Sequence, residues 1–130
     1  MQEAQEAHET DRICLLLVED DILVRTTVAL MLEDDGFRVV EASTAAEAQR
    51  LMQGGLNAMV MVTDIDLGAG PSGLELADRL RNQQPDLAII FITGRVASLA
   101  GRRPNQREAI LPKPFEGSTL AQLVRQMVPH

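Results

Sequence analysis

The feature that most constrains this chain is a series of five short apolar runs spread along it. They are ICLLLV (13–18), FRVVEA (37–42), AMVMVT (58–63), LAIIFIT (87–93) and AILP (109–112). Short, nearly continuous apolar runs are typical of strands buried on both faces, which occur in parallel sheets that helices cover. The runs therefore predict a parallel sheet that is covered on both faces, rather than an antiparallel sheet with one solvent-exposed face.

Segments with helix signals separate these runs. The first, DILVRTTVALMLEDDG, has Leu23, Thr27, Leu30 and Met31 at helical spacing and Gly36 as a stop. STAAEAQRLMQGG opens on a Ser/Thr cap, Ser72 caps GLELADRLRNQQ, and STLAQLVRQMV (118–128) is the last helix. Residues 94–107 carry a mixed signal, with a short helix expected over 96–101. Strands alternating with helices predict an α/β fold: a doubly wound, five-stranded parallel sheet with helices on both faces.

Length and charge narrow the function classes. The chain has 130 residues, 45% of them hydrophobic, which is enough for one domain with a buried hydrophobic core. Four of its 19 acids fall in residues 1–11, which are expected to form an acidic tail before a domain at 12–130. The net charge of −7 argues against direct DNA binding. No apolar run has the length of a membrane span or a signal peptide, so a cytoplasmic protein without membrane contact is expected.

Polar side chains gather where the predicted strands end. Because the carboxyl ends of parallel strands share one edge of the sheet, ligands of such folds bind there. Carboxylates close together repel one another, and Mg²⁺ is the hard cation that suits them. Lysine occurs once among twelve basic residues, at a strand end, where a compact ammonium on a flexible stem is useful. The residues concerned are Glu19, Asp20, Asp64, Asp66, Thr93 and Lys113.

Four motifs in order, LLLVEDD, VTDIDL, FITG and KPF, resemble the receiver domain of bacterial response regulators, in the manner of a single-domain chemotaxis regulator. The resemblance implies the flavodoxin-like strand order 2-1-3-4-5. It also implies that Asp64 is the phosphoacceptor. Mg²⁺ would be held by Asp20, Asp64 and the backbone carbonyl of Asp66, with Glu19 acting through a water molecule. Such a protein is a signalling phosphoacceptor that catalyses only its own phosphorylation and dephosphorylation.

The same resemblance assigns the remaining site residues. Thr93 and Lys113 would contact the phosphoryl group, and Asp66 and Arg95 would tune its hydrolysis. The chain departs from the family at Ile110, where an aromatic switch residue is usual. The loop over residues 64–73 also looks one residue longer than the commonest version.

Partners and rival functions follow from these assignments. The expected phosphodonor is a histidine kinase or histidine phosphotransfer protein, and a downstream protein partner is expected at residues 94–110, which include an arginine-rich stretch. Because no output domain follows the last helix, a single-domain regulator or a receiver cut from a longer protein is expected. One rival is a receiver-like adaptor that works without phosphorylation. The other is a haloacid-dehalogenase-like phosphohydrolase, which Gly68 and the acid-free LVRQMVPH ending disfavour.

Overall fold

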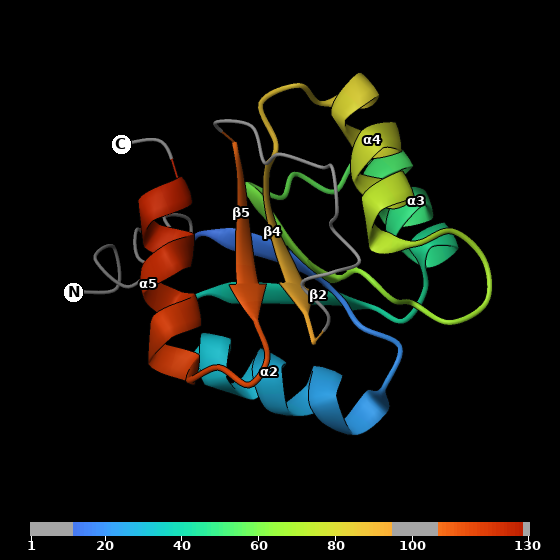
Figure 1. Cartoon of the computed structure of the whole chain (residues 1–130). Coiled ribbons are helices and arrows are strands. Elements are labelled where there is room, and N and C mark those ends of the chain that lie inside the picture. The colour runs from blue at the N-terminus through green and yellow to red at the C-terminus, as the bar shows by residue number, and fades with distance from the viewer. Residues whose placement is uncertain (1–11, 95–106, 129–130) are drawn as a thin grey trace.

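The computed structural model describes residues 12–94 and 107–128, and within them the predicted fold is confirmed. The five strands are all parallel and lie in the order β2-β1-β3-β4-β5 (Figure 1). The strands are β1 (Cys14–Val18), β2 (Arg38–Ala42), β3 (Val60–Asp64), β4 (Ala88–Thr93) and β5 (Glu108–Pro112). The helices are α2 (Ile22–Asp34), α3 (Ala45–Gln53), α4 (Gly73–Gln83) and α5 (Gly117–Met127). The helix expected over 96–101 and the acidic tail lie outside the described residues.

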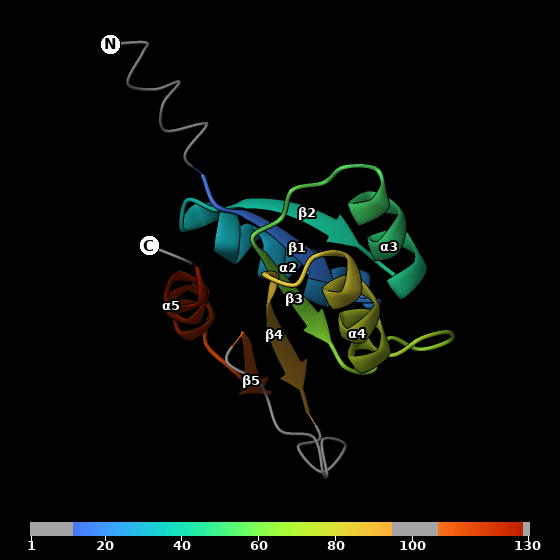
Figure 2. The same ribbon diagram turned by 90° about the horizontal axis from the view of Figure 1, so that it is seen from above.

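Two apolar layers pack on opposite faces of the sheet. Leu15 and Leu17 of β1 belong to the layer beneath α2 and α5, whereas Leu16 and Val18 belong to the layer beneath α3 and α4. Figure 2 shows α3 and α4 together on one side of the strands and α5 on the other. Successive side chains of a strand point to opposite faces. An uninterrupted apolar run is therefore what a central strand needs when both faces are covered.

Helix caps fix where the chain turns from strand to helix. The Asp21 carboxylate accepts hydrogen bonds from Leu23 N and Val24 N at the start of α2. Ser72 and Glu75 form a reciprocal capping box at the start of α4. Both caps lie beside the loops that follow β1 and β3, so they hold the loops that carry the acidic residues.

The buried face of α2 is only one of the two apolar stripes in its sequence. The helix buries Val28, Ala29 and Leu32, while the side chains of Leu23 and Leu30 are 77% and 57% exposed. The segment contains two apolar stripes at helical spacing, and periodicity alone does not choose between them. The stripe that contains Val28 and Leu32 packs on the sheet, and the stripe that contains Leu23 and Leu30 faces outward.

Candidate functional site

The six polar residues named from the strand ends all line one open pocket of about 650 Å³ at the carboxyl edge of the sheet. Glu19 and Asp20 follow β1, Asp64 ends β3 and Thr93 ends β4. Lys113 follows β5. Parallel register explains this meeting, because Val18 pairs with Thr63 and Asp64 pairs with Ile92, so the strands end level with one another.

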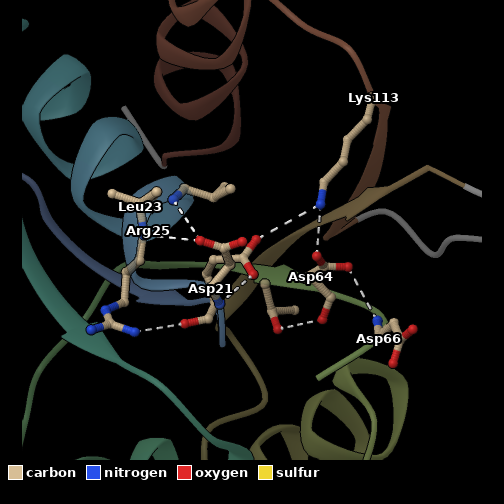
Figure 3. Close-up of polar contacts among 9 residues, drawn as sticks. Asp21, Leu23, Arg25, Asp64, Asp66 and Lys113 are labelled. Carbon is tan, nitrogen blue, oxygen red and sulfur yellow. Dashed lines mark hydrogen bonds and ion pairs between the residues drawn. The ribbon is translucent and has the colours of Figure 1, made fainter. Parts of the chain in front are cut away.

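Asp64 and Lys113 form the central pair of the pocket. Lys113 Nζ lies 2.8 Å from Asp64 Oδ2, and the backbone N–H of Asp66 donates to Asp64 Oδ1 at 3.1 Å (Figure 3). Partial burial works to lower the pKa of Lys113, but the hydrogen bond and charge of Asp64, together with Glu19 and Asp20, outweigh burial and raise this pKa. The lysine is therefore held as a cation against the aspartate.

Glu19 is the buried acid of the pocket, with 6% of its surface exposed. Its Oε2 accepts from the backbone N–H of Asp21 at 3.0 Å, and its Oε1 lies 3.7 Å from Lys113 Nζ. Burial, with smaller contributions from Asp20 and Asp64, raises the pKa of Glu19 to about 7, although the Asp21 N–H and Lys113 oppose the rise. One lysine therefore does not fully neutralise this group of acids at neutral pH.

The donor set fits a small, hard cation. Within residues 12–94 and 107–128, no three or more His, Cys, Asp and Glu side chains are grouped to hold a metal ion by themselves. An ion would need other oxygens as well, and Mg²⁺ commonly takes one or two carboxylates with waters and further oxygen ligands. A side chain at Gly68, which has a φ of +75°, would come within 3.2 Å of Asp20 Oδ2. Glycine there keeps open the space beside this exposed carboxylate.

The loop after β3 is shaped by two of its residues. The Asp66 carboxylate accepts from Gly68 N at 3.3 Å, so in this state it stabilises its own loop. At the end of the loop, a Cβ on Gly73 would collide with the Asp64 carbonyl oxygen. Gly73 also donates its N–H to Ile65 O at 2.8 Å. The start of α4 is thus packed directly against the backbone of Asp64.

Two further residues lie on the neighbouring strands. Thr93 is buried at the end of β4, and its carbonyl accepts from the backbone N–H of Lys113 at 2.8 Å. Ile110 of β5 pairs with Phe91 and packs, half-buried, against the layer beneath α3 and α4. Arg95 and most of the 94–110 surface lie outside the described residues.

Arg25 is a residue that the sequence interpretation did not single out. Its Nη1 donates to the carbonyl oxygen of Glu19 at 3.0 Å (Figure 3). Its Nε lies 3.2 Å from Glu41 Oε1. The only signal in the sequence was an arginine in the first turns of a helix that follows an acidic cluster. Its partner on β2 is 16 residues away, and only the folded sheet brings the two together.

The fold and the pocket define a flavodoxin-like α/β domain with an acid cluster, an aspartate–lysine pair and a buried threonine at the carboxyl edge of its sheet. A sequence model of the response regulator receiver domain matches residues 15–125, and the chain belongs to that family.

Known relatives agree with this assignment. Response regulator Rre1 of Synechocystis is 34% identical over 123 residues, which span 89% of this chain and 52% of Rre1. Sensor protein TorS of Escherichia coli is 31% identical over 121 residues, which span 92% of this chain and 13% of TorS. The crystal structure of a response regulator receiver protein from Sinorhizobium medicae is 28% identical with a TM-score of 0.83, and the match covers 91% of this chain and 95% of that one.

Rre1 is a response regulator and TorS is a sensor protein, and the chain spans about half or less of the length of each. The receiver domain is therefore the part that they share with this chain. In the described part of the chain, no helix has both the length and the apolar character to cross a membrane.

Proposed function

We propose that this receiver domain accepts a phosphoryl group from a histidine kinase or histidine phosphotransfer protein onto Asp64, with Mg²⁺ as cofactor, in a two-component or phosphorelay pathway. The observation that carries the proposal is the 2.8 Å pair between Asp64 Oδ2 and Lys113 Nζ inside an acid-lined pocket. The pair joins a nucleophilic carboxylate to the cation that would neutralise an incoming phosphoryl oxygen.

The chemistry needs positioning more than covalent assistance. An Asp64 oxygen attacks phosphorus, the bond from phosphorus to the donor imidazole nitrogen breaks, and the electron pair stays with the imidazole. Lys113 exchanges its contact with Asp64 for one with a phosphoryl oxygen, and the Thr93 hydroxyl contacts another. Because Lys113 is one-third exposed on a flexible stem, it can follow the charge as it moves outward.

The proposed cation ligands are the carboxylates of Asp20 and Asp64 and the backbone carbonyl of Asp66, with Glu19 acting through water. When bound, Mg²⁺ supplies positive charge to the acids and to the phosphoryl oxygens. Asp66 and Arg95 are proposed to tune hydrolysis of the acyl phosphate. For Asp66, that role requires release of its hydrogen bond from Gly68 N.

The exposed stripe of α2 is the proposed docking surface for the phosphodonor. A largely apolar groove of about 630 Å³ runs between α2 and the loop after β5, lined by Leu23, Val24, Thr27, Val28, Met31, Lys113, Pro114 and Phe115. Val24 and Lys113 also line the acidic pocket, so the groove adjoins that pocket. A donor that places phosphohistidine on Asp64 must cover this rim. The occupant is therefore the phosphohistidine-bearing domain of the donor.

Signal output is proposed to pass to a protein partner through the 94–110 surface, in the cytoplasm and without direct DNA or membrane contact. The net charge of −7 supports the exclusion of DNA, since phosphates would be repelled. The alternative is an adaptor that works without phosphorylation, which Ile110 favours because an isoleucine in place of a ring cannot swing as an aromatic switch does.

The deciding experiment is labelling by acetyl phosphate with Mg²⁺, followed by intact mass. The wild type should gain one phosphoryl group, Asp64→Ala should gain none, and the exposed control Asp86→Ala should behave as the wild type. Labelling of Asp64→Ala at the wild-type level would refute the acceptor assignment. Absence of labelling in all three would favour the adaptor, and turnover of a phosphate ester would revive the phosphohydrolase.

A further inference from the structure

Arg25 joins three elements next to the acidic pocket. It belongs to α2, its Nη1 donates to the Glu19 carbonyl oxygen just beyond β1, and its Nε pairs with Glu41 of β2. The Arg25 side chain is mostly buried, while that of Glu41 is 41% exposed. The planar guanidinium gives each acceptor a separate nitrogen, Nη1 for the Glu19 carbonyl and Nε for Glu41, whereas a lysine would have to reach both from a single nitrogen.

The backbone of Glu19 is therefore held on both sides. Its N–H donates to the carbonyl oxygen of Ala42 on β2 at 3.0 Å, and its own carbonyl accepts from Arg25 at 3.0 Å. The Glu19 carbonyl lies in the same rigid peptide plane as the nitrogen and Cα of Asp20. Fixing the direction of this carbonyl thus fixes where the Asp20 side chain leaves the backbone.

We propose that Arg25 is a positioning residue for the cation site, which holds Asp20 in place through the Glu19 peptide. The inference rests on the proposed function, because it assumes that Asp20 is a ligand of Mg²⁺. Arg25 touches neither the proposed ligand side chains nor the reacting atoms, and it acts through the backbone alone.

Charge and position predict opposite effects when Arg25 is removed. Arg25 is a cation near the pocket, so by Coulomb's law alone its loss makes the acids more attractive to Mg²⁺ and tightens binding. If Arg25 positions Asp20, its loss weakens binding instead. The sign of the change therefore separates the two effects.

The test is Mg²⁺ affinity measured by calorimetry at a temperature well below unfolding. Arg25→Met should weaken binding by about tenfold, the low end for partners outside the coordination shell. The double variant Arg25→Met/Glu41→Gln keeps the net charge of the wild type, and it should be weakened as much. Arg79→Met is the matched control, because it removes an exposed arginine whose hydrogen bond joins Gln49. Arg25→Lys must reach both acceptors from a single nitrogen, so its affinity for Mg²⁺ should lie between those of the wild type and Arg25→Met.

The Mg²⁺ measurements separate failure of the Arg25 inference from failure of the proposed function. If the wild type itself binds no Mg²⁺, the proposed function fails. If the wild type binds and Arg25→Met binds equally or more tightly, Arg25 has no positioning role. If Arg25→Met melts at a lower temperature but keeps the wild-type Mg²⁺ dissociation constant, Arg25 stabilises the fold and does not position Asp20. Should Arg25→Met fail to fold, Arg25→Lys decides the matter by the same comparison.

Discussion

Substituting Glu19 by glutamine should stabilise the metal-free protein at alkaline pH. Folding raises the pKa of this carboxyl from 4.5 to about 7, chiefly through burial. The folded state therefore binds the Glu19 proton more tightly than the unfolded state. The free energy of unfolding falls as pH rises between these two values.

The magnitude follows from the two pKa values. With 1.36 kcal/mol per unit, ionising Glu19 in the fold costs about 3 kcal/mol once the pH is above 7 and about 1 kcal/mol at pH 5. The amide introduced by Glu19→Gln carries no charge at any pH, and its oxygen can still accept from Asp21 N. The gain of Glu19→Gln over wild type should therefore grow by about 2 kcal/mol from pH 5 to pH 8.5.

The assay is urea unfolding in EDTA at several pH values. The matched control is Glu33→Gln, which neutralises an exposed glutamate of α2. It should shift stability by a small amount that does not grow with pH. A difference between Glu19→Gln and wild type that stays constant from pH 5 to 8.5 would refute the argument that the buried acid is strained by ionisation.

Three further changes test other parts of the site. Asp20→Asn should remove most of the stabilisation by Mg²⁺, which for a ligand at 100 times its dissociation constant is about 2.7 kcal/mol, while stabilising the metal-free protein; an undiminished shift in melting temperature would show that Asp20 is not a ligand. Gly73→Ala should destabilise the fold by about 1–3 kcal/mol in urea unfolding, because its Cβ would collide with the Asp64 carbonyl. Its control, Gly94→Ala, places the Cβ in open space, and equal losses in both would contradict the packing argument. Leu23→Asp should slow phosphotransfer from a histidine kinase without changing acetyl phosphate labelling, and a loss of both would show general damage rather than lost docking.

The sheet and the composition of the site were accessible from sequence because they depend on local rules. Each central strand is buried on both faces, so its apolar run is unbroken, and Asp64 must appear where such a run ends. Parallel pairing then brings the strand ends to one edge without further information. The short distance between Asp64 and Lys113 follows from topology as much as from the motifs that contain them.

Other features depend on relations that no local pattern contains. Leu23 and Leu30 face outward, and because both stripes of α2 are apolar, the sequence does not say which of them is buried. The contact of Arg25 with Glu41 joins a helix to the edge strand β2. The raised pKa of Glu19 depends on burial that an adjacent, exposed Asp20 does not share.

Lys113 links the charge balance of the pocket to the strands beneath it. Its side chain lies between Asp64 and Glu19, at 2.8 and 3.7 Å, while its backbone N–H is bonded to the carbonyl of Thr93. A phosphoryl group on Asp64 would move negative charge away from the aspartate oxygen that Lys113 now contacts, and the ammonium would follow it. A displaced Lys113 side chain would act on the end of β5 and, through the Thr93 carbonyl, on the end of β4. Because the connection between these two strands contains most of the 94–110 surface, we expect a change of charge at Asp64 to reach the proposed output surface through one side chain and one backbone hydrogen bond.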